Sequence, residues 1–362
     1  MATYFTQQLL KWNKSTNQRE MPWKGELDPY KIWLSEVILQ QTRVEQGRAY
    51  YEKFIHAFPT IQDLAKAKDE KVFKLWEGLG YYNRCRNLLY TARYLSKTSK
   101  GVFPKTYIEL LALKGIGPYT AAAIASFAFD LPHAVVDGNV FRVLSRFYGI
   151  ATPIDTKEGL AIFNELAFKN LAQKTPGEYN QAIMDFGATV CKPAAPDCVA
   201  CNLSSKCVAY NVNQVNQLPI KLKRITKKKR YFDFICFNYK GSWMIQQRGE
   251  GDVWNGLFQF YVLENDRLPA FSSAYLDSVL SNQFSLVKNQ WSFIGADKSP
   301  KIFKQILTHQ TIEARFIAIE ISVMPKMLQK ALWVKPKQFA KYAFPKIIND
   351  FLVTFHHGSA LE

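Results

Sequence analysis

The chain has 362 residues, a length that predicts two or three domains instead of one. Hydrophobic residues make up 48% of it and charged residues 21%, which provides for buried cores and excludes a disordered chain. The formal net charge of +17 excludes an acidic protein and indicates a polyanionic partner such as nucleic acid; the alternative is a merely basic soluble protein.

The N-terminal segment and the lengths of the apolar runs predict the cellular location of the protein. Residues 1–12 lack a basic stretch followed by an apolar one, so we expect no secretory signal. The longest apolar runs, such as 121–129, are much shorter than a membrane span. We therefore expect a soluble cytoplasmic protein without a membrane partner, whose six cysteines are thiols or metal ligands and not disulfides.

After a short amphipathic helix within residues 1–20, a helix that begins at Asp28 carries the first candidate catalytic residue. Asp28 caps this helix, and Pro29 suits its first turn. Glu36 shares a helical face with Ile32 and Leu39, so its carboxyl group points into an apolar stripe that favours the protonated form. Such a group is a candidate general acid. The alternative is a buried glutamate paired with an arginine.

Helical periodicity continues over several segments of the first two hundred residues. The segments are 49–58, 61–67, 70–78, 83–95, 157–172 and 178–189. Between two of them, Tyr81 and Tyr82 follow a glycine at a helix start. Such tyrosines are either core residues or wedges presented to a stack of bases.

A tight turn between two helices forms the candidate DNA grip. Gly115 and Gly117 let the backbone turn sharply, and Pro118 suits the first position of the next helix. The free N–H groups and the helix dipole at such a start attract an anion. A lone Gly-X-Gly is weak evidence, but its place between two amphipathic helices predicts a helix-hairpin-helix.

Asp137 follows an extended segment and precedes the next predicted helix, at residues 140–147. An aspartate at an N-cap accepts backbone N–H bonds, which predicts a depressed pKa and an ionised carboxylate. The alternative is a simple helix cap. Glu36 and Asp137 thus have environments that push their pKa values apart, as expected of an acid and a charge stabiliser that work together.

Four of the six cysteines lie within 17 residues, in the spacing C-x6-C-x2-C-x5-C. Four thiolates in one compact loop predict a metal site, either zinc or an iron–sulfur cluster. The presence of one C-x2-C pair instead of two favours the cluster. The ligands would be Cys191, Cys198, Cys201 and Cys207, whereas the isolated Cys85 and Cys236 are interpreted as core residues.

The composition changes after Leu218. Residues 220–230 form a basic segment, which is either a phosphate-tracking strip or a solvated linker. Alternating periodicity then predicts a β-hairpin over 231–248, further strands at 256–260 and 315–321, and helices at 274–284 and 345–355. This region is expected to be a separate α+β domain.

Five motifs in this order resemble the A/G-specific adenine DNA glycosylases, the MutY family. They are WLSEVILQQTRV around Glu36, GLGYYNR, LKGIGPYTAAAI, VVDGNVFRVLSR and the four-cysteine loop. The resemblance spans residues 5–350 and implies a multidomain fold. The core would be an all-α helix-hairpin-helix glycosylase with an iron–sulfur cluster loop, followed by a C-terminal α+β Nudix (MutT)-like domain.

The implied domains are an all-α catalytic region over 1–219, a basic linker over 220–229 and an 8-oxoguanine recognition domain over 230–362. Within the catalytic region, residues 27–134 would form the lobe with the helix-hairpin-helix. Residues 1–26 and 135–219 would form the iron–sulfur lobe.

The resemblance also implies roles for single residues. Glu36 matches the general acid that protonates adenine, Asp137 the carboxylate that stabilises the cationic sugar, Asn139 an orienting residue, and Tyr119 a tyrosine found in many members. The implied adenine pocket comprises Trp23, Lys24, Gln181 and Arg19. The implied DNA contacts, with two residues for 8-oxoguanine, are Gln41, Thr42, Tyr81, Gly115, Gly117, Thr308 and His309. The four cysteines match the ligands of a [4Fe–4S] cluster.

The chain departs from the family at two places. Leu307 stands where many members have phenylalanine, and Lys114 stands where many have proline. The C-terminal domain also lacks the glutamate-rich Nudix signature, so we expect recognition there and not pyrophosphate hydrolysis.

The resemblance implies a monomeric base excision repair enzyme that acts on double-stranded DNA containing 8-oxoguanine:adenine or guanine:adenine mispairs. Base flipping would precede hydrolysis of the N-glycosidic bond without strand cleavage. Two alternatives are a bifunctional, endonuclease III-like glycosylase and lyase, which needs a lysine at the position of Tyr119, and a non-catalytic iron–sulfur protein that binds DNA damage.

Overall fold

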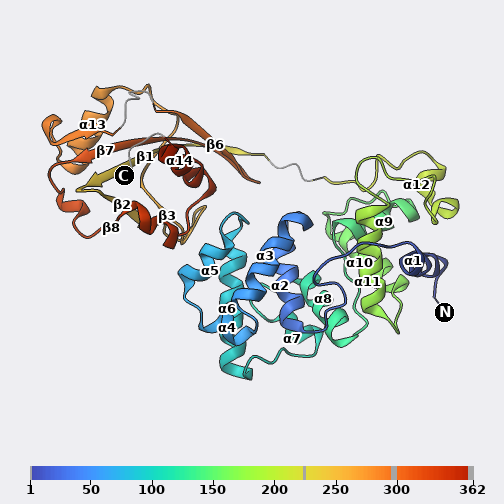
Figure 1. Ribbon diagram of the computed structural model, residues 1–362. Coiled ribbons are helices and arrows are strands. Elements are labelled where there is room, and N and C mark those ends of the chain that lie inside the picture. Colours follow the sequence, from blue (N-terminus) through green and yellow to red (C-terminus); the bar gives the residue numbers. More distant parts are fainter. Residues whose placement is uncertain (1, 223–225, 295–299, 358–362) are drawn as a thin grey trace. The chain divides into compact units, whose positions relative to one another are not determined.

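The computed structural model describes residues 2–222, 226–294 and 300–357. The chain forms two compact units, which are described separately (Figure 1). The first comprises Met1–Ala67 and Asn83–Arg224, and the second comprises Lys68–Tyr82 and Ile225–Glu362. Among the described residues, no helix is both long enough and apolar enough to span a lipid bilayer.

The regular elements described for the first unit are helices. They are α1 (Tyr4–Ser15), α2 (Pro29–Leu39), α3 (Val44–Ala57), α4 (Ile61–Lys66), α6 (Tyr82–Ser99), α7 (Tyr107–Leu111), α8 (Pro118–Phe129), α9 (Gly138–Tyr148), α10 (Lys157–Asn170), α11 (Pro176–Thr189), the 3-10 turn Ser204–Lys206 and α12 (Val208–Asn211). The helices predicted from periodicity are confirmed, with ends that differ by a few residues. Asp28 caps α2 and Pro29 takes its first turn, as predicted.

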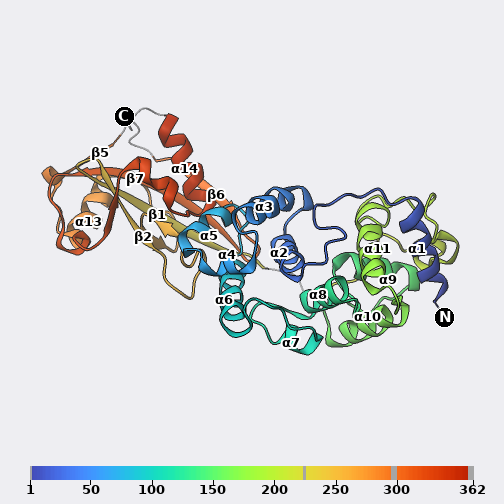
Figure 2. The same cartoon turned by 60° about the horizontal axis from the view of Figure 1, so that its bottom comes forward.

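Helix α8 lies at the centre of the first unit (Figure 2). It packs against α2, α7 and α11. Its residues from Thr120 to Ser126 are all buried, which is the pattern of a helix covered on every side. The helix that follows the hairpin turn is therefore a rigid support for that turn.

One apolar core joins α1, α9, α10 and α11 to a face of α8. Phe5 and Leu9 of α1, Leu144 of α9 and Phe163 of α10 are buried in it. Trp12 packs edge-on against Phe186 of α11 with ring centroids 5.0 Å apart. This core fixes the helices that carry the second candidate carboxylate and the cysteine loop.

The second unit is a mixed sheet with helices on its two faces. Its elements are α5 (Asp69–Trp76), β1 (Lys228–Tyr239), β2 (Ser242–Gln247), β3 (Phe258–Gln259), β4 (Tyr261–Asn265), α13 (Ser273–Phe284), β5 (Trp291–Phe293), β6 (Ile302–Ile306), β7 (Gln310–Ile321), β8 (Leu332–Val334) and α14 (Lys346–His357), with 3-10 turns at Lys288–Gln290, Lys326–Leu328 and Pro336–Lys341. The sheet order is β3-β2-β1-β7-β5, with β4 on β1, β6 on β7 and β8 on β2. β1 and β7 run parallel, and the other pairs run antiparallel.

The alternation of β1 and β7 divides their side chains between the two helices. Ile235 and Ile317 face α13, where Leu280 packs on them. On the opposite face, Phe316 stacks on Phe351 of α14 with centroids 4.2 Å apart. The predicted α+β domain is therefore confirmed.

Two predictions for this region need correction. The basic segment does not remain a linker to residue 229, because β1 begins at Lys228, whose partner in parallel β7 is Gln310. Residues 223–225 of the predicted linker lie outside the described residues. The predicted strand 256–260 is reduced to Phe258–Gln259, and β4 follows it from Tyr261.

The segment Lys68–Tyr82 belongs to the second unit, although the sequence predicts it within the all-α region. The Glu77 carboxylate accepts hydrogen bonds from Phe344 N at 2.8 Å and Asn349 Nδ2 at 3.0 Å. Lys74 Nζ donates to the Tyr342 carbonyl at 3.1 Å. These contacts are between residues far apart in sequence, so periodicity could not predict them.

Candidate active site

Helix α2 places Glu36 in an apolar environment. The Asp28 carboxylate accepts the Tyr30 N–H at 2.9 Å and starts the helix. Ile32, Trp33 and Leu34 on the same helix are buried together with the Glu36 side chain. Glu36 itself is only 7% exposed.

The pKa of Glu36 is raised to about 7: burial raises it most, a hydrogen bond from Tyr119 lowers it, and the nearby Asp137 charge raises it. The Tyr119 hydroxyl also lies 3.3 Å from Met184 Sδ. The carboxylate is the stronger of these two acceptors. Glu36 is therefore a carboxyl group that holds its proton near neutral pH, as the sequence predicts.

Asp137 is held as the N-cap of α9. Its Oδ1 accepts the N–H groups of Asn139 and Val140, both at 2.8 Å. Its Oδ2 accepts Asn139 Nδ2 at 2.8 Å. The predicted cap is confirmed, but the predicted direction of the pKa shift is wrong. Burial raises the pKa of Asp137 more than these hydrogen bonds and the charge of Arg142 lower it.

Arg142 connects this cap to the cysteine loop. Its Nη2 donates to Asn139 Oδ1 at 2.8 Å and to the Gly187 carbonyl at 2.6 Å, and its Nε donates to the Cys191 carbonyl at 2.7 Å. Arg142 was not among the site residues predicted from the sequence. Its position three residues after Asn139 on α9 was a usable signal, because residues at that spacing share a helical face.

The hairpin turn meets its geometric requirements. Gly115 has φ +82°, and a Cβ there would lie 2.5 Å from Asn87 Cβ of α6. Gly117 caps α8 with open space around it. Pro118 follows as the first residue of the helix. The start of α8 is therefore open to an approaching anion.

One cavity in the first unit brings most of the predicted residues together. The predicted residues that line it are Arg19, Trp23, Glu36, Gln41, Thr42, Gly117, Tyr119, Asp137, Asn139 and Gln181. Trp23 packs edge-on against Tyr51 with centroids 5.3 Å apart, which fixes one wall. The cavity thus combines a proton-holding carboxyl group, a second carboxylate and a helix start.

Other predicted residues lie outside this cavity. Lys24 lines neighbouring pockets, and Gly115 lies in the turn itself. Tyr81, Thr308 and His309 lie in the second unit. There the hydroxyl groups of Tyr81 and Thr308 are hydrogen-bonded to each other.

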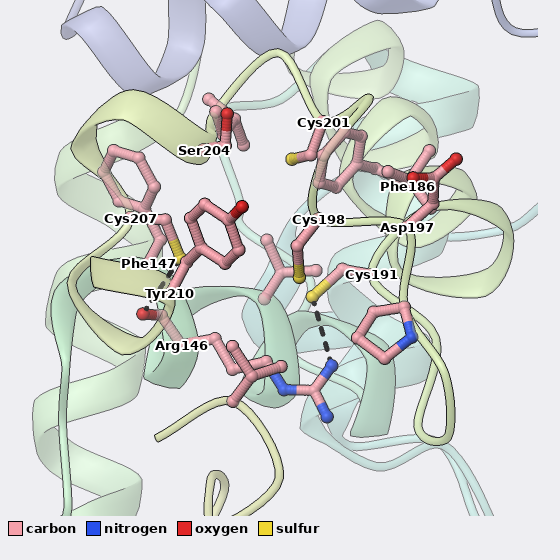
Figure 3. Close-up of a pocket in the computed structure, with 15 residues that line it drawn as sticks. Arg146, Phe147, Phe186, Cys191, Asp197, Cys198, Cys201, Ser204, Cys207 and Tyr210 are labelled. Carbon is pink, nitrogen blue, oxygen red and sulfur yellow. Dashed lines mark hydrogen bonds between the residues drawn. The ribbon is translucent and has the colours of Figure 1, made fainter. Parts of the chain in front are cut away.

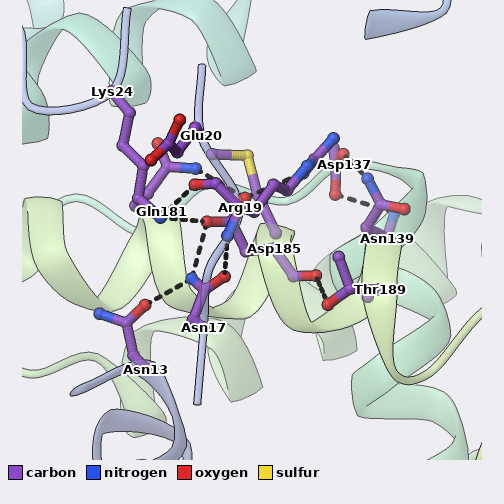
Figure 4. A network of polar contacts seen from close by, with 12 residues as sticks. Asn13, Asn17, Arg19, Glu20, Lys24, Asp137, Asn139, Gln181, Asp185 and Thr189 are labelled. Carbon is purple, nitrogen blue, oxygen red and sulfur yellow. Dashed lines mark hydrogen bonds and ion pairs between the residues drawn. The ribbon is translucent and has the colours of Figure 1, made fainter. Parts of the chain in front are cut away.

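A buried carboxylate that was not predicted from the sequence lies behind two residues of the cavity wall, Arg19 and Gln181, and is hydrogen-bonded to both (Figure 4). The side chain of Asp185 on α11 has no exposed surface. Its carboxylate forms ion pairs with Arg19 at 2.9 Å and with Lys24 at 3.0 Å. Its position four residues after Gln181 on one helix was a usable signal. Its other partners are about 160 residues away in the chain, beyond the reach of helical periodicity.

The four clustered cysteines line one pocket between α9, the end of α11 and α12 (Figure 3). All four are free thiols. Cys191 Sγ lies 3.5 Å from Arg146 Nη1, and Cys207 Sγ lies 3.4 Å from the Arg146 carbonyl oxygen. Cys85 and Cys236 are buried elsewhere, as predicted for core residues.

Comparisons with known proteins agree with this architecture. Residues 34–167 match the HhH-GPD superfamily of base excision DNA repair proteins, and residues 234–353 match the NUDIX domain. A solved structure of a thermostable thymine-DNA glycosylase superimposes with a TM-score of 0.54 at 29% identity, over 57% of this chain and 95% of that one. The fold and the site therefore define a helix-hairpin-helix DNA glycosylase with a C-terminal Nudix domain.

Two relatives identify the particular family within this class of DNA glycosylases. The adenine DNA glycosylase of Buchnera aphidicola subsp. Schizaphis graminum is 31% identical over 97% of this chain and 98% of its own length. That of Buchnera aphidicola subsp. Baizongia pistaciae is 38% identical over 73% of this chain and 76% of its own length. The chain belongs to the adenine DNA glycosylase family.

Proposed function

We propose that this enzyme removes adenine from DNA in which adenine is paired with 8-oxoguanine or guanine, and that it hydrolyses the N-glycosidic bond without cleaving the strand. The observation that carries this proposal is the shared cavity of Glu36 and Asp137 beside the hairpin start of α8. One of the two groups holds a proton near neutral pH, and the other is fixed by three hydrogen bonds.

The chemistry of base removal needs both groups. Adenine leaves poorly unless it is protonated, and Glu36 is the candidate donor. The sugar that remains carries positive charge in the transition state, and the fixed carboxylate of Asp137 is the candidate stabiliser. Glu36, having lost its proton, then acts as the base that activates water. The base must first leave the duplex stack to reach this cavity.

The test is incubation with a duplex that contains adenine opposite 8-oxoguanine, followed by hot alkali. We expect a strand break with the native protein and at least a hundredfold slower excision with Glu36→Gln, in line with the usual contribution of general acid catalysis. Glu165→Gln, a change on the exposed face of α10, is the matched control. Equal rates for native protein and Glu36→Gln would contradict the proposal.

The residue that supports hydrolysis without strand cleavage is Tyr119. A lyase forms a Schiff base through an amine, and a phenol cannot form one. The Tyr119 hydroxyl is instead buried beside Glu36, which together with burial raises the pKa of Tyr119. We expect no covalent protein–DNA complex after borohydride treatment. High-yield trapping would favour the bifunctional alternative.

We also propose that Cys191, Cys198, Cys201 and Cys207 hold a [4Fe–4S] cluster. Four sulfur donors on one pocket suit either zinc or iron. When bound, the cluster would crosslink the end of α11 to α12.

The cluster proposal is tested by iron analysis and by absorbance at about 400 nm, where sulfur-to-iron charge transfer is expected. Cys198→Ser should lower both the iron content and the absorbance. Stoichiometric zinc without iron would overturn this assignment and leave the glycosylase proposal untouched.

We propose that the second unit supplies the preference for 8-oxoguanine through Thr308 and His309. The hydroxyl of Thr308 is hydrogen-bonded to that of Tyr81, so a recognition residue and a candidate wedge share one polar contact. Thr308 lies in the short connection between β6 and β7. Thr308→Ala is expected to reduce the preference for 8-oxoguanine over guanine several-fold; an unchanged preference would contradict this role.

A further inference from the structure

The Asp185 carboxylate is the centre of a saturated network. Its Oδ1 accepts Arg19 Nη1 at 2.9 Å and Gln181 Nε2 at 3.0 Å. Its Oδ2 accepts Asn17 Nδ2 at 2.9 Å and Lys24 Nζ at 3.0 Å. An ionised carboxylate only accepts, at about four lone-pair sites, so these four donors use its full capacity. Figure 4 shows the donors converging on α11 from the segment between α1 and α2 and from α11 itself.

This network fixes the orientation of the Gln181 amide. Because the Asp185 carboxylate cannot donate, the nitrogen end of the amide must face it. The amide oxygen is then the end that remains for a ligand, and no hydrogen bond to it comes from the described residues. Gln181 lines the same cavity as Glu36 and Asp137. The wall of the cavity therefore presents an acceptor to whatever base enters it.

Each cation of the network also places a donor on the buried carboxylate. Arg19 and Lys24 each form an ion pair with the buried carboxylate. Lys24 Nζ donates further to the Arg19 carbonyl at 2.9 Å. Without Asp185, both cations and the nitrogen end of the amide would be free to turn. The wall could then present the donor end of the Gln181 amide in place of its acceptor end.

We propose that Asp185 is a positioning residue that sets the hydrogen-bond polarity of the base pocket. By taking up the Gln181 nitrogen it leaves an amide oxygen facing the flipped base, which selects a purine with an amino group at position 6 over one with a carbonyl group there. A site built to accept a hydrogen bond rejects a base that offers a second acceptor, because both groups are left unpaired. This inference rests on the proposed removal of adenine.

A purely structural role is the competing explanation. Asp185 also ties the segment of Asn17 to Lys24 onto α11, and loosening this segment would slow excision of every base alike. The two roles are therefore separated by the ratio of kcat/KM for adenine to that for hypoxanthine, which carries a carbonyl group at position 6. Both bases are placed opposite 8-oxoguanine in the same duplex.

Asp185→Asn is the main variant, since its amide can donate and allows Gln181 to reverse. We expect the adenine-to-hypoxanthine ratio to fall about tenfold or more. Asn17→Ala is the matched control: it removes a donor from Oδ2 and leaves the Gln181 contact on Oδ1 intact. It is expected to slow both reactions equally, with an unchanged ratio.

Gln181→Ala keeps the test decisive should Asp185→Asn fold poorly, because the selection passes through the Gln181 oxygen. Its ratio is expected to fall as well, and adding Asp185→Asn to it should change the ratio no further. A native ratio in Gln181→Ala, or equal losses for both bases in folded Asp185→Asn, would overturn the inference. Failure of the native protein to excise adenine would instead overturn the proposed function.

Discussion

Replacing Glu36 with glutamine should remove activity and, at alkaline pH, stabilise the protein. Burial raises the pKa of this carboxyl group to about 7 from an ordinary value of 4.5. The folded state therefore binds the proton more tightly than the unfolded chain, and stability falls as pH rises from the unfolded pKa to the folded one. Above both values the cost of the buried charge reaches about 3 kcal/mol. A neutral amide of the same shape carries no such cost.

The assay is urea unfolding of native protein and Glu36→Gln at two pH values. The free energy of unfolding of the variant, relative to native protein, should rise by about 2 kcal/mol between about pH 5.5 and about pH 9. Glu165→Gln on the exposed face of α10 should show no such change. A difference between native protein and Glu36→Gln that does not depend on pH would refute the assigned burial cost.

The same proton governs the rate: excision by the native enzyme should fall about tenfold per pH unit above about pH 7 as Glu36 ionises, which a single-turnover pH profile measures. Gly115→Ala strains a residue at φ +82° and should weaken DNA binding, measured by fluorescence anisotropy, or lower the free energy of unfolding by about 1–3 kcal/mol, measured by thermal unfolding. Gly117→Ala, at a position with open space around it, should have a smaller effect in both assays. Asp233→Ala should destabilise the second unit by about 3–5 kcal/mol in urea unfolding, because it leaves the buried Arg315 guanidinium unpaired; Asp350→Ala, which breaks an exposed pair, is the control.

Local patterns predicted the elements that local physics controls. The cap at Asp28, the turn at Gly115 and the change to alternating periodicity from residue 231 follow from propensity and periodicity, which act over a few residues. The burial of Glu36 could also be predicted from the sequence, because an apolar stripe on one helix identifies the side that faces the core. The roles of these residues came from the family resemblance, which the comparisons confirm at the level of the family.

Whether burial or hydrogen bonding decides the pKa of a carboxyl group could be judged only from the tertiary structure. Asp137 has the predicted cap bonds, yet burial by surrounding elements outweighs them and raises its pKa. No local pattern measures that burial. The placement of Lys68–Tyr82 with the C-terminal unit likewise depends on contacts across more than 260 residues of sequence.

The sequence by itself determined two carboxylates, a hairpin turn and a four-cysteine loop, because each is a short motif with its own physical signature. Only the tertiary structure decided that Glu36 and Asp137 line one cavity, about a hundred residues apart in the chain. Only the tertiary structure also revealed Asp185, whose partners Arg19 and Lys24 arrive from the other end of the catalytic unit. Proximity in space arises from packing, and packing joins residues that no sequence period connects.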